Sequence, residues 1–204
     1  MEERNQVRLT RAKWLMHEAF LTLLEQKSFY TITVKDIIST AGVSRSVFYL
    51  HYEDKYALLD EMKRLLLDNF GLTRVDLQAG GPQALIKTGD YTPDGLLAKD
   101  FEYIEKHHRL FKALMGPNGD GKFYLEFRDY IASYQKVIVR SWGVEDFYSP
   151  LAMRYMANII SGAYVGIFLD WLAADMQPPA ATMGKLLAAL IAQLDPKPID
   201  EKDF

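Results

Sequence analysis

Cysteine is absent from the 204 residues of this chain. Its absence excludes disulfide bonds and thiol catalysis and argues against zinc ligation of the zinc-finger kind. An excess of one charge is also lacking, since the formal net charge is only −3, which argues against indiscriminate coating of nucleic acid. The lack of cysteine suits a reducing cytoplasm, which is the setting we expect. No sustained alternation of apolar and polar residues is found, so we expect an all-helical fold.

A run of apolar residues long enough to cross a membrane is missing too. The longest uncharged stretch lies between Arg154 and Asp170, where fifteen residues include Asn158 and Ser161. A membrane-spanning helix needs about twenty mostly apolar residues. The start of the chain, Met1–Arg4, has no apolar signal core behind it. We therefore expect a buried helix of a soluble protein and no contact with a membrane.

Helical periodicity covers most of the chain. In the first predicted helix Trp14, Phe20 and Leu24 recur at helical spacing. The segment from Leu77 to Gly95 is rich in glycine and proline, which predicts a connecting loop. Asp54 is predicted to cap one long helix. Two short helices are described in the next paragraph, and the remaining predicted helices span Thr10–Lys27, Pro93–Glu105, His107–Met115, Lys122–Trp142, Pro150–Met176 and Ala181–Leu194.

Two short helices joined by a tight turn are the most informative feature of the chain. Thr33 caps the first helix, and Asp36 stands three residues on as its capping partner. Gly42 gives the backbone freedom that a sharp corner needs. Ser44 caps the second helix, on which Phe48 faces the core. The pattern predicts a helix-turn-helix, whose second helix can lie in a DNA major groove.

The first turn of that second helix carries the residues expected to face bases. Arg45 and Ser46 lie there, and an arginine can bind guanine O6 and N7 with both arms of its guanidinium group. Val47 can touch a thymine methyl group. Thr33 and Ser44 can hold a phosphate or only cap their helices, and both interpretations stay open.

Basic residues are only slightly concentrated near the N-terminus. Residues 1–64 hold ten Lys and Arg against nine Asp and Glu, whereas residues 65–204 hold fourteen against eighteen. Lys55 adds its charge to helix N-terminal amides that attract phosphate. One copy of the chain can make few phosphate contacts, and affinity for DNA rises steeply with their number. We therefore expect DNA binding by a dimer.

The motif resembles that of the TetR family of transcriptional regulators. The resemblance covers about the first sixty residues and is carried by Thr33-Val34, Ala41-Gly42-Val43-Ser44, Phe48-Tyr49-Leu50-His51-Tyr52, Lys55 and Leu58-Leu59. Segments 108–114 and 162–171 are similar to a C-terminal type common in Firmicutes. Ser28 and Ser46 stand where the family often has glycine. Because Ser46 lies in the second helix of the motif, we infer no operator sequence.

The resemblance implies a three-helix DNA-binding domain at residues 1–53 and a helical ligand-binding and dimerisation domain at residues 54–204. It implies contacts to bases or phosphates from Lys35, Tyr49 and His51. The expected protein is a homodimeric repressor of a palindromic operator, released when a small effector moves the helix after the motif. An adaptor or co-activator that acts through a protein partner is the alternative.

Two sets of residues are expected in the second domain. The predicted helix Pro150–Met176 is apolar nearly all round, and the family pairs it and the last helix between subunits. The residues expected at this interface are Ile159, Gly162, Ala163, Gly166, Leu187, Leu190 and Ile191. Aromatic side chains can form an ordinary core or line a pocket for a small apolar or aromatic effector. The expected lining is Phe101, Phe111, Phe127, Tyr130, Tyr134, Tyr164 and Phe168.

An enzyme, a metal site and a cofactor are not expected. The glycines before Lys122 do not complete a phosphate loop, because Phe123 follows the lysine and no strand precedes it. His107 and His108 are adjacent on a helix, so their side chains point apart. No nucleophile and base can be paired by pattern.

Overall fold

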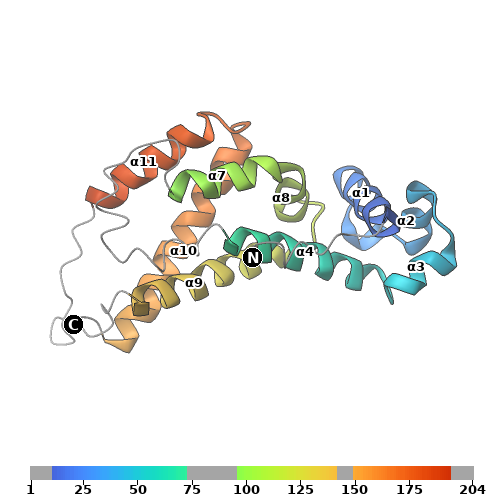
Figure 1. The fold of residues 1–204 in the computed structure, drawn as a ribbon, viewed down its shortest axis with the longest axis horizontal. Helices are drawn as coiled ribbons and strands as arrows, with labels where there is room; N and C mark the ends of the chain where they lie inside the picture. The colour runs from blue at the N-terminus through green and yellow to red at the C-terminus, as the bar shows by residue number, and fades with distance from the viewer. Residues whose placement is uncertain (1–10, 73–95, 142–148, 194–204) are drawn as a thin grey trace, which may run out of the picture. The chain divides into compact units, whose positions relative to one another are not determined.

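The computed structural model describes residues 11–72, 96–141 and 149–193, and every regular element within these ranges is helical (Figure 1). The all-helical prediction is confirmed. The elements are α1 Arg11–Gln26, the 3₁₀ turn η1 Phe29–Thr31, α2 Val34–Ala41, α3 Arg45–His51, α4 Lys55–Leu72, α7 Leu96–Lys106, α8 His108–Met115, α9 Phe123–Ser141, α10 Pro150–Ala173 and α11 Ala180–Gln193. The predicted loop at 77–95 lies outside the described residues.

The chain forms two compact units, which do not follow a single cut along the sequence. The first unit comprises residues up to Leu66 together with Arg109–Phe123, and the second comprises Leu67–His108 and the residues from Tyr124 onward. Much of α4 and nearly all of α8 therefore belong with α1, α2 and α3. The boundary expected between residues 53 and 54 follows from the family resemblance and stays a prediction.

Phenylalanine side chains build the core of the first unit. Phe20 of α1, Phe29 of η1 and Phe48 of α3 are all at most 1% exposed, and the rings of Phe20 and Phe29 meet edge to face with centroids 6.2 Å apart. Burial of one such side chain contributes about 1.5–3 kcal/mol. Since α3 has only seven residues and would be unstable alone, this packing is what keeps it helical.

Aromatic rings from four helices meet in the second unit. Phe70 of α4 packs against Tyr103 of α7, Phe127 of α9 and Phe168 of α10, with centroid distances of 5.6, 5.3 and 6.3 Å. All three pairs are edge-on, the geometry that the ring quadrupole favours. Phe101 of α7 adds edge-on contacts to Phe168 at 4.9 Å.

The long helix α10 leaves much of its apolar surface uncovered by the chain. Among the described residues it is the one helix with the length and composition of a membrane span, a property it shares with core helices of soluble proteins. One side packs inward through Val165, Phe168 and Trp171, whereas Ile159 is 71% exposed. The other exposed large apolar residues of α10 are Leu151, Tyr155 and Ile160.

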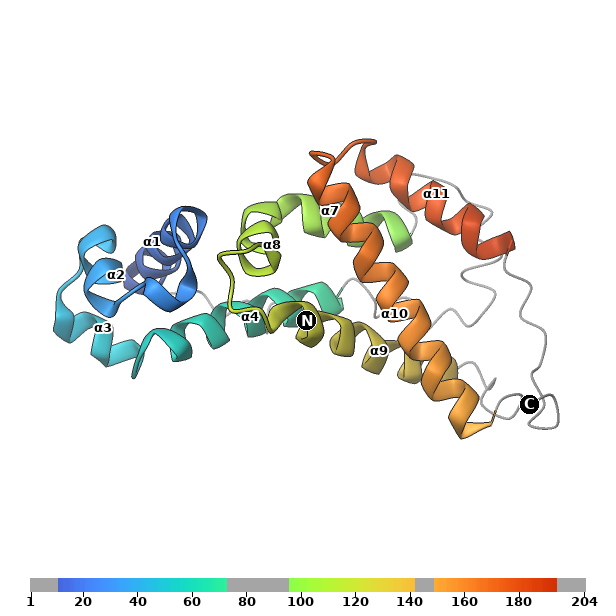
Figure 2. The same cartoon turned by 180° about the vertical axis from the view of Figure 1, so that it is seen from behind.

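Helices α7 and α11 lie side by side in both views (Figures 1 and 2). Their close approach depends on Gly184 of α11. A Cβ atom at Gly184 would stand 2.6 Å from both the backbone N and Cα of Ala98 on α7, a distance that real contacts do not reach.

We predict that Gly184→Ala destabilises the protein. The new methyl group must push α11 away from the α7 backbone, and overpacking of this kind costs about 1–3 kcal/mol. Urea denaturation followed by circular dichroism measures the loss. Lys185→Ala, at the exposed neighbouring position on α11, is the control and should stay within about 0.5 kcal/mol of wild type. Equal behaviour of the two variants would contradict the close packing.

Candidate DNA-binding site

The turn between α2 and α3 has the local geometry predicted from the sequence. Thr33 Oγ1 accepts the Asp36 N–H at 3.2 Å, and the Asp36 carboxylate accepts the Thr33 N–H at 2.9 Å, which completes a capping box. Gly42 ends α2 at φ +65°, a backbone region that favours glycine. Ser44 Oγ accepts the Val47 N–H at 3.3 Å as the N-cap of α3. The helix-turn-helix prediction is confirmed.

The capping box is strengthened by an ion pair. Lys27 donates to the Asp36 carboxylate at 2.9 Å. That hydrogen bond, together with those from the Thr33 backbone and hydroxyl, lowers the pKa of Asp36 to about 2. The carboxylate is therefore charged at neutral pH, and α2 keeps its cap.

Most of the residues predicted to contact DNA are exposed to solvent. Phe48 is buried, and the opposite side of α3 is left open. The exposed predicted residues are Thr33, Lys35, Ser44, Arg45, Ser46 and Tyr49, and the partly buried ones are Val47, His51 and Lys55. The turn thus presents a polar surface with two cations at Lys35 and Arg45.

Leu50 is an exposed residue of α3 that the sequence did not single out. It is 77% exposed and lies four residues after Ser46, hence on the same side of the helix. In the motif it occupies the variable place between Tyr49 and His51. Because Phe48 faces the core, a residue two positions later lies on the opposite side of the helix. This spacing could have predicted from the sequence that Leu50 is exposed.

The hydroxyl groups at the two N-caps already have partners. Thr33 Oγ1 donates to the Asp36 carboxylate at 2.9 Å while it accepts the Asp36 N–H. Because a hydroxyl has one proton to donate, Thr33 has none left for a phosphate unless this bond breaks. Ser44 Oγ and Ser46 Oγ are hydrogen-bonded to each other at 2.9 Å. These contacts favour the capping interpretation for Thr33.

Lys55, expected to contact phosphate, is used inside the first unit. Its ammonium group donates to the carbonyl oxygens of Phe29, Tyr30 and Ile32 at 2.8, 3.1 and 2.8 Å, and it lies 4.6 Å from the centre of the Phe29 ring. Desolvation lowers its pKa. An ammonium group has three N–H donors, so in this conformation none remains for a phosphate oxygen.

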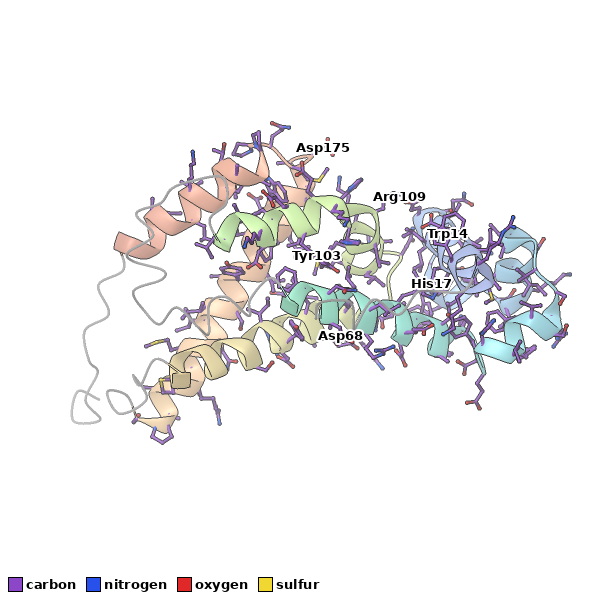
Figure 3. All side chains as sticks on the ribbon, viewed as in Figure 1. Trp14, His17, Asp68, Tyr103, Arg109 and Asp175 are labelled. Carbon is purple, nitrogen blue, oxygen red and sulfur yellow. The ribbon has the colours of Figure 1, made fainter. Side chains whose placement is uncertain are left out.

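The C-terminal end of α3 is fixed by hydrogen bonds centred on Tyr52, its C-cap residue. His17 of α1 (Figure 3) places Nε2 2.9 Å from the Tyr52 hydroxyl oxygen. That hydroxyl donates to Glu61 of α4, which also accepts from Lys13 of α1 at 2.7 Å. These four side chains, named here the Tyr52 junction, connect α1, α3 and α4.

Burial and charge act in opposite directions within the Tyr52 junction. Desolvation lowers the pKa of His17, and Glu61 only partly offsets it. Burial would raise the pKa of Glu61, but hydrogen bonds from Lys13 and Tyr52 outweigh it, so that pKa is lowered. Desolvation and Glu61 together raise the pKa of Tyr52. The junction therefore favours an ionised Glu61 with a neutral imidazole and a neutral phenol.

The segment from Arg109 to Phe123, distant in sequence, completes the first unit. Arg109 (Figure 3) donates to Glu25 of α1 at 2.9 Å. The Phe29 N–H donates to the Asn118 carbonyl at 2.7 Å, and the Tyr30 hydroxyl donates to the Asp120 carbonyl at 2.8 Å. The glycine-rich turn that failed as a phosphate loop is thus a structural part of this unit.

Asp120 also holds a buried ion pair in that turn. Lys63 of α4 donates to one carboxylate oxygen, and the N–H groups of Lys122 and Phe123 donate to the other at 3.1 and 3.2 Å. Burial alone would raise the pKa of Asp120, but Lys63 and the two amides outweigh it, so that pKa is lowered. Such a pair is stable only while its partners stay in place.

The residues expected to line a ligand pocket do not all lie together. Phe111 belongs to the first unit, where its ring faces Phe123 at 6.2 Å. The remaining ones belong to the second unit. Phe101, Phe127, Tyr164 and Phe168 are buried there, and Tyr130 is partly buried. The side chain of Tyr134 lies outside the described residues.

The residues expected at a dimer interface differ in their exposure to solvent. Ile159 and Leu190 are 71% and 53% exposed, whereas Leu187 is only 6% exposed and lies in the core of the chain. Ala163 and Gly166 are exposed, and Gly162 is partly buried. The side chain of Ile191 lies outside the described residues.

Two family models match the chain. The model described as bacterial regulatory proteins, tetR family, matches residues 18–62, which include α2 and α3. The model of a TetR-type transcriptional regulator C-terminal region matches residues 92–193, half of the chain. The chain belongs to the TetR family. That family is one of transcriptional regulators with a DNA-binding helix-turn-helix and is not a family of enzymes.

One curated relative supports the TetR assignment. It is the uncharacterized HTH-type transcriptional regulator YxbF of Bacillus subtilis, which is 27% identical over 176 residues. The match covers 86% of this chain and 43% of the relative. The chain thus spans less than half the length of that protein.

Solved structures with the TetR fold resemble the chain at low identity. A Clostridium perfringens protein described as a fatty acid metabolism regulator has a TM-score of 0.67 at 15% identity, with 90% of this chain and 100% of that one covered. The fatty acid degradation regulator FadR from Bacillus halodurans has a TM-score of 0.62 at 14% identity, with 91% of this chain and 97% of that one covered. The dihydroxyacetone kinase operon activator DhaS has a TM-score of 0.56 at 16% identity, with 89% of this chain and 95% of that one covered. Such likeness shows the fold alone.

We predict that Lys55→Met lowers the stability of this TetR-family chain. Three carbonyl groups lose their donor, two of them in partly buried hydrogen bonds, which should cost about 1–2 kcal/mol in the free energy of unfolding, measured by urea denaturation. The matched control is Lys35→Met, which removes an exposed lysine of α2 and should cost no more than about 0.5 kcal/mol. A smaller loss for Lys55→Met than for Lys35→Met would contradict the structural role.

Proposed function

We propose that this TetR-family chain is a ligand-responsive repressor that binds a palindromic operator as a homodimer. The observation that carries the proposal is the exposed N-terminal turn of α3, with Arg45 and Ser46 open to solvent above buried Phe48. Helix-turn-helix proteins place this turn against base edges. A regulator of this kind works on DNA in the cytoplasm.

Two cations of the motif supply the charge for the contact. Arg45 of α3 and Lys35 of α2 are both exposed, whereas Lys55 is occupied by backbone carbonyls and is left out of the proposed interface. We assign Arg45 to a guanine edge, where a bidentate pair discriminates by about 1–3 kcal/mol. We assign Lys35 to a phosphate or a nearby base.

The exposed apolar surface of the last two helices supports the homodimer. α10 exposes Ile159 and Tyr155, and α11 exposes Leu186 and Leu190. Large exposed apolar patches usually mark an interaction site in a soluble protein. A twofold dimer would carry two recognition helices, which must lie about 34–36 Å apart to enter successive major grooves.

The aromatic core of the second unit supports the proposal that the effector is apolar or aromatic. Phe70, Phe101, Phe127 and Phe168 already meet there through edge-on ring contacts, so a ligand would share in an existing apolar environment. Phe111 packs with Phe123 in the first unit, and we place it outside the pocket. The effector releases DNA only if it binds the non-DNA conformation more tightly.

Arg45→Ala is predicted to relax base preference at one position per half-site. The test selects bound duplexes from a random pool with wild type and with the variant, and the lost discrimination should be about 1–3 kcal/mol. Lys35→Ala is the comparison: if Lys35 contacts a phosphate, its loss weakens all duplexes alike and flattens the salt dependence, whereas a base contact would change preference at a second position. Unchanged preference in Arg45→Ala would refute its role, and a wild type that enriches no duplex but retains a protein partner would favour an adaptor.

Leu190→Glu is predicted to convert the dimer to monomer. The charge would be buried against the partner at a site where the isolated chain leaves leucine 53% exposed. Leu125→Glu on α9 is the matched control, since that leucine is 48% exposed and lies outside the proposed interface. Sedimentation velocity should find a monomer only for Leu190→Glu. A monomeric wild type, or the same behaviour of both variants, would contradict the interface.

A further inference from the structure

Arg45 and Tyr49 form a pair on the exposed side of α3. They are four residues apart, so their side chains are neighbours on the helix surface. The guanidinium carbon of Arg45 lies over the Tyr49 ring, 5.5 Å from its centroid. The Tyr49 ring in turn meets Phe48 edge to face, with centroids 5.5 Å apart and an interplanar angle of 84°. Because Phe48 is fully buried, these contacts lead from the core to the guanidinium group.

We propose that Tyr49 is a positioning residue whose ring holds the Arg45 guanidinium group ready for a base edge. The ring face, and not the hydroxyl group, carries this role. The proposal rests on the proposed function and deepens it, because it makes Tyr49 a determinant of sequence preference without direct contact to a base.

The physical need for such a contact follows from the exposure of Arg45. A long arginine side chain samples many rotamers, and a bidentate bond to guanine requires one of them. No salt bridge to Arg45 is found among the residues that the structure describes, so the Tyr49 ring is the group seen to restrain it. An exposed cation–π contact changes the population of the held rotamer by about two- to five-fold.

A direct phosphate contact from the Tyr49 hydroxyl is the competing role. The two roles depend on different atoms of the side chain and differ in their effect on DNA. A phosphate contact positions the protein and carries no sequence information, so its loss weakens every duplex alike. Loss of the ring instead reduces preference at the one position that Arg45 reads.

Selection from a random duplex pool distinguishes these roles. The proteins compared are wild type, Tyr49→Phe, Tyr49→Leu, Arg45→Ala and the Arg45→Ala/Tyr49→Leu double variant. Arg45→Ala locates the base position. At that position Tyr49→Leu should lose about two- to five-fold in preference, Tyr49→Phe should keep the preference whatever its overall affinity, and the double variant should lose no more than Arg45→Ala alone.

A second measurement on the free protein does not depend on DNA. The Arg45 Hδ protons should show an upfield ring-current shift by NMR in wild type and Tyr49→Phe, and the shift should vanish in Tyr49→Leu. Since Tyr49 is 47% exposed, these variants should retain the wild-type circular dichroism spectrum.

The outcomes separate this proposal from the proposed function. A wild type that enriches no duplex would overturn both. A wild type that selects an operator while Tyr49→Leu lowers binding to all duplexes equally, or while Tyr49→Phe loses as much preference as Tyr49→Leu, would overturn the positioning role alone. Arg45 protons without a ring-current shift would also overturn it.

Discussion

The placement of the recognition helix depends on the hydrogen bonds at the Tyr52 junction. α3 is only seven residues long, so its own backbone bonds cannot keep it folded. Phe48 buries one side of it, and the Tyr52 hydroxyl, between His17 and Glu61, fixes its last turn to α1 and α4. A satisfied polar network of this kind specifies one arrangement, because each buried group would be costly to leave unpaired. The direction in which Arg45 points is thus a tertiary property.

The sequence predicted those parts of the site that follow local rules. The Thr33–Asp36 capping box, the left-handed Gly42 and the Ser44 cap each depend on groups within a few residues of one another. Propensity and spacing are sufficient for such features. The approximate helix bounds and the inward direction of Phe48 followed from short-range periodicity, although the predicted helix Pro150–Met176 ends at Ala173 in the structure. The TetR resemblance came from the residues of the motif, and the family models confirm it.

Contacts between distant residues could not be predicted in this way. The carbonyl groups that accept hydrogen bonds from Lys55 precede it by more than twenty residues, and a lysine at a helix start carries no sequence pattern that reveals them. Phe111 has the same aromatic periodicity as Phe101, yet they lie in different units. On α11 both Leu187 and Leu190 read as apolar interface residues. Which of them the chain itself buries is settled by its fold, in which α11 packs against α7.

The two units share three chain crossings, at Leu66–Leu67, His108–Arg109 and Phe123–Tyr124. The first and third crossings are joined inside the first unit by the Lys63–Asp120 pair, whose members are both buried and lie only a few residues from them. To separate such a pair costs about 3–5 kcal/mol, because one buried charge is left without its partner. Displacement of α4 alone would therefore be opposed, whereas joint movement of α4 and the turn before α9 keeps the pair intact.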